Sequence, residues 1–243
     1  MEVRIFPDHD ALSQHTADII ATLIRKHPSA AWCMASGETP RRTCQLLVQK
    51  ASNESLDLTS SFFFGLDEWV GVPPDNKGSC RFFFENELFE PLGFGESSYH
   101  LFDALSADLK NECRRMDDLI KQKGGIELII VGIGMNGHIG FNEPGIPFNS
   151  YSHVANLDET TTTVGQKYFQ TETKLDRGIT IGLQHLIEAQ EAILLANGSR
   201  KAEVISRTVQ GPLDNLFPAS IMQSHKNGKV LADKEASALL TNK

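Results

Sequence analysis

The 243-residue sequence lacks a long hydrophobic run. Its longest apolar stretches, such as residues 128–131, fall far short of the roughly 18 to 20 residues that a membrane-spanning helix needs. The sequence also lacks a block of lysine or arginine, and its 23 basic against 31 acidic residues give a formal net charge of -8. We therefore expect no nucleic-acid partner and no membrane association. The first residues lack the basic and then apolar start of a signal peptide, which favours a cytoplasmic location.

Cysteine is scarce too, and its distribution disfavours two kinds of cross-linked site. The four cysteines are scattered through the first half of the chain without a C-x-x-C spacing. This is typical of reduced structural thiols rather than of a disulfide framework or a zinc site. No cluster of His, Cys and acidic residues has the spacing of metal ligands, so we expect no metal ion. With 40% hydrophobic and 22% charged residues, the composition is that of a packed soluble globule.

Short apolar runs alternate with longer amphipathic segments, and this alternation indicates the fold class. The predicted strands are residues 30–35, 61–64, 126–131, 178–181 and 192–196. The predicted helices are residues 10–26, a segment opened by Thr39 and Pro40, and residues 79–88, 108–122, 159–168 and 199–209. This order predicts an α/β fold with a mostly parallel sheet. No linker divides the chain, so we expect one domain over residues 1–243.

In open parallel sheets, ligands bind beyond the carboxyl ends of the strands, so the loops after the first three predicted strands are the expected place for chemistry. The first of these loops is residues 36–40. Gly37 permits close backbone approach, Ser36 and Thr39 supply hydroxyls, and the following helix offers free N–H groups at its positive end. The loop predicts a cradle for an anion or for sugar hydroxyls, with a plain capped turn as the alternative.

The second loop carries two adjacent carboxylates, Asp67 and Glu68, directly after a very apolar strand. A carboxylate in this place can act as a proton-transferring base whose pKa the apolar surroundings raise. The alternative is a pair of acids on a solvated turn, and the residues by themselves do not separate the two interpretations.

The third loop, residues 132–145, is the most informative. Its first six residues match G-x-G-x-x-G after a strand, the fingerprint of a dinucleotide site. That fingerprint requires a helix directly afterwards, and Gly140, Pro144 and Gly145 disfavour one. The loop also presents one histidine, His138, with Glu143 five residues later and Asn136 beside it. Since histidine titrates near neutrality and a carboxylate can fix its tautomer, this loop predicts a proton-transferring pair.

Two motifs together resemble those of the glucosamine-6-phosphate deaminase/isomerase family: Leu-Asp-Glu-Trp-Val-Gly at 66–71 and Gly-Ile-Gly-Met-Asn-Gly-His-Ile-Gly-Phe-Asn-Glu-Pro-Gly at 132–145. The resemblance covers nearly the whole chain and includes residues 36–40, 198–202 and 217–220. The segments most similar to the galactosamine-6-phosphate isomerase branch are residues 67–69, 78–80 and 177–183. The resemblance implies a modified Rossmann-like, three-layer α/β fold.

The resemblance also implies a reaction, in which an amino sugar 6-phosphate becomes a ketose 6-phosphate and ammonia without a metal or nucleotide cofactor. His138 matches the family residue that moves a proton from the anomeric hydroxyl to the ring oxygen, and Glu143 would orient its imidazole. Asp67 matches the base that takes the C2 proton and returns one at C1. Asn136 stands where larger, allosteric members carry an aspartate, so it can form hydrogen bonds but supplies no charge.

The resemblance places further residues against the substrate. Lys201 matches a family lysine and Lys167 stands where other members often carry arginine, so both are expected to bind the phosphate. Without the family match, a solvated helix face would be the better interpretation of each lysine. Glu38 stands where many members carry glycine, and its carboxylate is a candidate to discriminate the C4 epimers. The other expected substrate contacts are Ser36, Gly37, Thr39, Glu68 and Gly137.

Two other functions compete with this one. A 6-phosphogluconolactonase shares the fold and a Gly-His turn, but it is expected to continue with a Thr-Ala-Ser-Leu-Phe-Pro-like run, whereas this chain has Ile-Gly-Phe-Asn-Glu-Pro at 139–144. A sugar-phosphate-sensing regulatory domain would need a DNA-binding segment, for which we expect no room at the N-terminus. The expected partner is thus a small amino sugar phosphate. Residues 147–157 show none of the basic residues of an effector pocket, and a homo-oligomer is left open.

Overall fold

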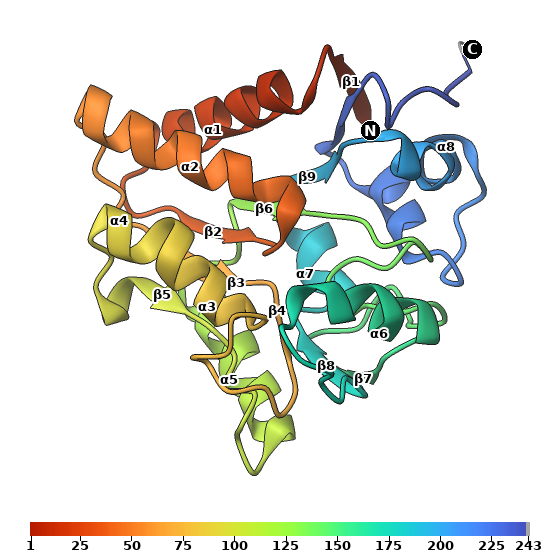
Figure 1. Ribbon diagram of the computed structural model, residues 1–243. Coiled ribbons are helices and arrows are strands. Elements are labelled where there is room, and N and C mark those ends of the chain that lie inside the picture. Colours follow the sequence, from red (N-terminus) through yellow and green to blue (C-terminus); the bar gives the residue numbers. More distant parts are fainter. Residues whose placement is uncertain (242–243) are drawn as a thin grey trace.

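A computed structural model describes residues 1–241 of the chain (Figure 1). The strands of its central sheet are β1 Glu2–Phe6, β2 Ala31–Met34, β3 Phe62–Gly65, β5 Tyr99–His100, β6 Leu128–Val131, β9 Glu191–Ala196 and β10 Gly228–Asp233. They lie in the order β1-β10-β9-β6-β2-β3-β5, and every neighbouring pair is parallel. The predicted α/β class with a mostly parallel sheet is confirmed.

Helices cover both faces of this sheet. The α-helices are α1 His9–Lys26, α2 Glu38–Glu54, α3 Cys80–Phe84, α4 Glu90–Leu92, α5 Leu109–Gln122, α6 Glu159–Gly165, α7 Leu183–Glu188 and α8 Ala202–Gln210. The shorter helical turns are η1 Glu85–Phe89, η2 Glu96–Ser98, η3 Gln166–Tyr168, η4 Ser199–Lys201 and η5 Pro218–Ser224. Side chains alternate between the faces of a strand, so in β2 Trp32 and Met34 join the core formed with α1 and α2, whereas Ala31 and Cys33 join the core formed with α5, α7 and α8. The predicted three layers follow from this alternation.

A second, smaller sheet is antiparallel. Its strands are β4 Asp67–Trp69, β7 His153–Asn156 and β8 Arg177–Thr180, in the order β4-β8-β7. The strand predicted at 178–181 therefore exists but does not belong to the parallel sheet, because a buried strand has the same apolar pattern in either kind of sheet. The sequence pattern misses the short strands β4, β5 and β7, and it misses both β10 and β1, an edge strand whose residues are mostly exposed.

Two predicted helix starts need correction. Helix α2 begins at Glu38, after Gly37 with a φ of 114°, which an L side chain rarely adopts. Thr39 therefore lies inside the first turn and does not cap the helix. The helix predicted over residues 79–88 begins one residue later, where the Ser79 hydroxyl accepts two backbone N–H bonds, and after α3 it passes into the π-helical turn η1. Of the helices within residues 1–241, none has both the length and the apolar character of a membrane span.

Candidate active site

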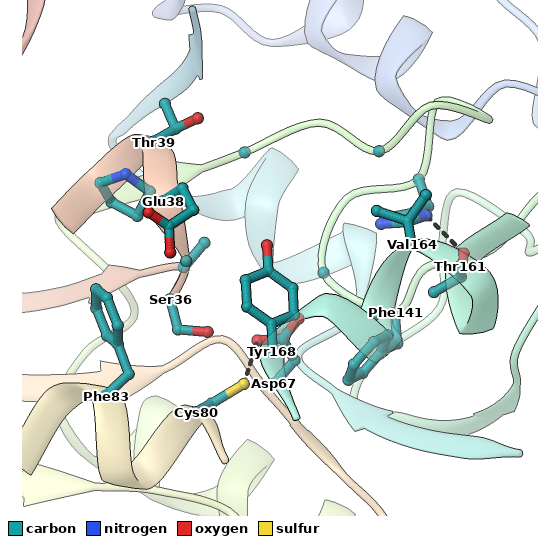
Figure 2. Close-up of a pocket in the computed structure, with 18 of the residues that line it drawn as sticks. Ser36, Glu38, Thr39, Asp67, Cys80, Phe83, Phe141, Thr161, Val164 and Tyr168 are labelled. Carbon is teal, nitrogen blue, oxygen red and sulfur yellow. Dashed lines mark hydrogen bonds between the residues drawn. The ribbon is translucent and has the colours of Figure 1, made fainter. Parts of the chain in front are cut away.

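A pocket of about 220 Å³ lies where the loops that follow β2 and β6 meet β4, α3 and the α6–η3 segment (Figure 2). The predicted site residues that line it are Ser36, Gly37, Glu38, Thr39, Asp67, His138, Lys167 and Lys201. The predicted site residues outside its lining are Glu68, Asn136, Gly137 and Glu143. The structure thus brings the three predicted loops together and divides their residues into a lining set and a supporting set.

Asp67 is the acid of the lining set. It is the first residue of β4, and its carboxyl faces the pocket (Figure 2). Burial, reinforced by the neighbouring charge of Glu68, raises the pKa of Asp67 to about 7. The Cys80 thiol lies 3.7 Å from Asp67 Oδ1 and opposes this rise by donating a hydrogen bond. Asp67 therefore has the basicity of a proton acceptor that works near neutral pH.

Glu68 lies outside the pocket lining, unlike Asp67 beside it. Its side chain is buried, and its two oxygens accept hydrogen bonds from four donors at the start of α3 and in β4. The donors are the Trp69 N–H at 2.9 Å, the Ser79 hydroxyl at 2.7 Å, the Cys80 N–H at 3.0 Å and the Arg81 N–H at 2.9 Å. Glu68 thus holds the first turn of α3 against β4 and supports the site without lining it.

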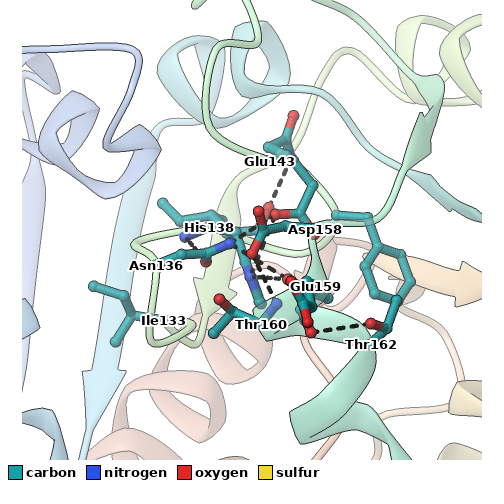
Figure 3. Close-up of polar contacts among 12 residues, drawn as sticks. Ile133, Asn136, His138, Glu143, Asp158, Glu159, Thr160 and Thr162 are labelled. Carbon is teal, nitrogen blue, oxygen red and sulfur yellow. Dashed lines mark hydrogen bonds and ion pairs between the residues drawn. The ribbon is translucent and has the colours of Figure 1, made fainter. Parts of the chain in front are cut away.

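His138 projects from the glycine-rich loop after β6 into the same pocket. Its Nδ1 lies 2.9 Å from Thr161 Oγ1 and 3.8 Å from Glu143 Oε2 (Figure 3). Burial, followed by the charge of Lys201, lowers the pKa of His138 to about 4. The imidazole is therefore neutral at physiological pH, and because Nδ1 faces Thr161, Nε2 is the nitrogen available to a ligand.

Asn136 and Glu143 stand behind the imidazole. The Asn136 side-chain amide donates to Glu143 Oε2 at 2.9 Å, and its carbonyl oxygen accepts from the His138 backbone N–H at 3.2 Å. Burial raises the pKa of Glu143, whereas hydrogen bonds from Thr161 and Asn136 lower it. Both residues can orient His138, and neither contacts the pocket directly.

Backbone geometry explains two glycines of this loop. A side chain at Gly134 would place its Cβ 2.3 Å from the His138 ring, so only glycine lets the imidazole fold back over the turn. Gly137 has a φ of 84°, and a Cβ there would meet the Phe217 ring at 2.3 Å. Gly137 lies outside the pocket lining, and the shape of the loop requires glycine at this position.

The pocket lining carries the cationic side chains Arg41, Lys77, Lys167 and Lys201, and the charge of Lys167 acts on Lys201. Lys201 ends η4, and its ammonium donates to the carbonyl oxygen of Ile133. Burial, followed by the charge of Lys167, lowers the pKa of Lys201 to about 8. Lys167, in η3, is exposed, and its Nζ lies 4.8 Å from the centroid of the Tyr168 ring. An anionic group bound here would offset the cost of holding these two cations close together.

The first loop forms the rim of the pocket beside α2. The Glu38 side chain is 64% exposed and pairs with Arg41 at 3.3 Å. Because an exposed ion pair contributes little free energy, the side chain can turn toward a ligand at small cost. The Thr39 hydroxyl donates to Asn197 Oδ1 at 2.6 Å, which ties the loop to the end of β9. Ser36 lies deeper, near Asp67 and Cys80 (Figure 2).

The sequence model of the family described as "Glucosamine-6-phosphate isomerases/6-phosphogluconolactonase" matches residues 8–232. The chain belongs to this family. Among its relatives, the glucosamine-6-phosphate deaminases of Shouchella clausii and Bacillus pumilus are each 37% identical to it, over 97% and 98% of this chain and 96% and 100% of theirs. A solved structure described as a monomeric glucosamine-6-phosphate deaminase matches with a TM-score of 0.95 and 33% identity, over 98% of this chain and 100% of that one.

Lactonases of the family share the fold at lower identity. The 6-phosphogluconolactonase of Trypanosoma brucei matches with a TM-score of 0.80 and 18% identity, over 99% of this chain and 98% of that one. This likeness concerns the fold alone. The predicted resemblance to the deaminase/isomerase family and the Rossmann-like fold are confirmed by the full-length matches to deaminases.

Three residues of this family member's pocket escape the sequence patterns. Thr161 contacts His138 from α6, but it stands in a run of four threonines in which nothing marks one member. Cys80 lies against Asp67, and although it belongs to the branch-like segment 78–80, nothing in the sequence places its thiol beside that carboxylate. Tyr168 lines the pocket from η3, at the end of a predicted helix. Among residues 1–241, no three His, Cys, Asp or Glu side chains are placed to hold a metal ion.

Proposed function

We propose that the chain converts an amino sugar 6-phosphate into a ketose 6-phosphate and ammonia. The observation that carries this proposal is the presence in one pocket of a carboxyl with a pKa of about 7, a neutral histidine and the neighbouring lysines Lys167 and Lys201. The names of the full-length relatives, which are glucosamine-6-phosphate deaminases, support it. No metal or nucleotide is needed, since each step is a proton transfer or the addition or loss of a small molecule.

Substrate binding begins at the phosphate. Lys201 and Lys167 form the cationic end of the pocket, so the phosphate binds there and the sugar extends toward Asp67 and His138. A bound dianion stabilises the protonated form of Lys201, whose pKa is only about 8 in the free pocket. Affinity should therefore decrease as the pH rises past this value.

His138 opens the sugar ring. Its free Nε2 accepts the proton of the anomeric hydroxyl and returns it to the ring oxygen as the C1–O5 bond breaks, which yields the open-chain aldehyde. Thr161 and Glu143 face Nδ1, and the carboxylate stabilises the imidazolium that forms between the two transfers.

Asp67 then moves a proton between two carbons. It takes the C2 proton, while the aldehyde oxygen gains a proton, and the product is a C1–C2 enolamine. Return of the proton to C1 leaves a CH₂OH group and an iminium at C2. Water adds to this iminium, and the carbinolamine loses ammonia to give the ketose. The sum of the steps consumes one water and releases one ammonia for each sugar phosphate.

The sugar epimer is a finer part of the proposal. The relatives are named for glucosamine 6-phosphate, whereas the motifs at 67–69, 78–80 and 177–183 favour galactosamine 6-phosphate. We propose that both are turned over and that the galacto sugar is preferred, with Glu38 on the pocket rim as the group that meets the C4 hydroxyl.

Ammonia and ketose phosphate should be measured together from both hexosamine 6-phosphates, with Asp67→Asn as the test variant. The wild type should release the two products in equal amounts. Asp67→Asn should bind substrate with nearly unchanged affinity and lose exchange of the C2 hydrogen in D₂O, because it keeps the shape and removes the base. Hydrolysis of 6-phosphogluconolactone without ammonia release from either sugar would contradict the proposal.

A further inference from the structure

The Cys80 thiol occupies an unusual place beside the proposed base. Cys80 is the first residue of α3, and its side chain is buried in the pocket wall between Ser36 and Asp67 (Figure 2). Its Sγ lies 3.7 Å from Asp67 Oδ1, within the range of a hydrogen bond from sulfur. The thiol therefore faces the carboxylate that must take a proton from carbon.

The contrast with the adjacent acid shows why this contact matters. Glu68 accepts hydrogen bonds from three backbone N–H groups and one hydroxyl. Within the described range 1–241, the Asp67 carboxylate accepts a hydrogen bond from the Cys80 thiol alone. Strong donors stabilise a carboxylate and make it a weaker base, whereas S–H is a weak donor. Burial raises the pKa of both acids, but the start of α3 opposes the rise with three hydrogen bonds at Glu68 and with one weak thiol at Asp67.

We propose that Cys80 is a positioning residue for the reaction: its thiol orients the Asp67 carboxylate with a single weak hydrogen bond and tunes its basicity. This inference rests on the proposed function, in which Asp67 is the base. It assigns Cys80 no bond to substrate and no change of oxidation state.

The other groups around Asp67 make the effect of the thiol measurable. Glu68 adds negative charge from β4 itself, Cys33 faces it from β2, and Tyr168 faces it from η3. None of these groups donates a hydrogen bond to the Asp67 carboxylate in the described part of the chain. Removal of the thiol therefore leaves the carboxylate without a donor, and the pKa of Asp67 must rise.

The test is the pH profile of kcat/KM for Cys80→Ala and Cys80→Ser in the full chain. Cys80→Ala should move the acidic limb, which reports ionisation of Asp67 in the free enzyme, up by about half a pH unit. At pH values below the limb, kcat/KM of Cys80→Ala should then be about threefold lower than that of the wild type, and at alkaline pH the two should be equal. Cys80→Ser keeps a donor and should bring the limb back toward the wild type. Cys113→Ala, which removes a buried thiol from α5, should leave the profile unchanged.

An acidic limb that does not move in Cys80→Ala would overturn the inference. An upward shift of equal size in Cys80→Ser would also overturn it. An inactive wild type would instead refute the proposed function. A second measurement does not depend on catalysis or on the folding of a Cys80 variant. The infrared S–H stretching band of the wild-type protein should move to lower frequency as Asp67 ionises, and Asp67→Asn should abolish this movement. An S–H stretching frequency that changes neither with pH nor in Asp67→Asn would refute the contact.

Discussion

Replacing Glu68 by glutamine tests whether this carboxylate supports the fold or the substrate. The substitution keeps the size of the side chain and replaces one oxygen by an NH₂ group, which cannot accept a hydrogen bond. Each oxygen of Glu68 accepts two hydrogen bonds, so either orientation of the amide disturbs two of the four donors. In the better orientation the Ser79 hydroxyl turns to accept, and the Arg81 N–H loses Glu68 but keeps the Ser79 hydroxyl oxygen, at 3.0 Å, as an acceptor.

The expected cost follows from these contacts. Loss of one hydrogen bond to a charged group costs about 1.5 to 3 kcal/mol, and the remaining hydrogen bonds lose the assistance of the charge. Burial raises the pKa of Glu68 in spite of these hydrogen bonds, so removal of the buried charge offsets part of the loss. We therefore expect Glu68→Gln to reduce the free energy of unfolding by about 1 to 2 kcal/mol. For a chain of this length, this corresponds to a decrease in Tm of roughly 2 to 8 °C. Loss of the Glu68 charge should also lower the pKa of Asp67, because that charge contributes to the rise.

Thermal unfolding and the pH profile of kcat/KM check the two effects, with Asp67→Asn as the matched control for stability. Asp67 lies next to Glu68, and among residues 1–241 its carboxylate accepts a hydrogen bond from the Cys80 thiol alone. Folding raises its pKa to about 7, so its ionised form destabilises the fold increasingly from acidic pH up to that value. Asp67→Asn should therefore leave the Tm at about pH 8 unchanged or higher. A Glu68→Gln variant with an unchanged Tm and a raised KM would refute this reasoning and make Glu68 a substrate contact.

Two further predictions concern the pocket. Lys201→Met should raise KM by about 10-fold to 100-fold, as expected for loss of a charge-assisted contact with the phosphate. It should also raise the pKa of His138 in an NMR titration. Lys226→Met, at an exposed lysine, should have neither effect, and an unchanged KM in Lys201→Met would favour a solvated lysine. Glu38→Gly should reduce the ratio of kcat/KM for galactosamine 6-phosphate to kcat/KM for glucosamine 6-phosphate. An unchanged ratio would exclude Glu38 from substrate selectivity. A wild-type preference for the gluco sugar would overturn the galacto assignment.

The strand ends of the central sheet could be predicted because apolar runs and polar loops follow one another along the chain. The runs at 30–35, 61–64 and 126–131 correspond to β2, β3 and β6, and the loops that follow them meet at the pocket. What the pattern could not supply is the partner of each strand. The run at 178–181 pairs with β4 and β7. This pairing could not be predicted, because hydrogen bonding between strands distant in sequence leaves no periodic pattern in either strand.

The division of labour between Asp67 and Glu68 shows the same limit at the level of single residues. Taken as a loop, residues 65–71 predict two equivalent acids. As a strand they are not equivalent, since successive side chains point to opposite faces. In β4, Asp67 faces the pocket and Glu68 faces the start of α3. A strand of only three residues is too short for its alternation to be recognised, so the residue pattern identifies the pair of acids, and only the resemblance to the family selects Asp67 as the base.

The charges of the pocket also determine which step depends on the phosphate. In the free pocket, Lys201 contributes to the low pKa of His138, which weakens the imidazole as a proton acceptor. On the proposed mechanism, a phosphate dianion beside Lys201 compensates this charge and raises the basicity of His138. The pKa of Asp67 depends instead on burial, Glu68 and Cys80. Ring opening is therefore coupled to phosphate binding, whereas proton transfer from C2 is not, so the phosphate contributes to the chemistry of His138 as well as to affinity.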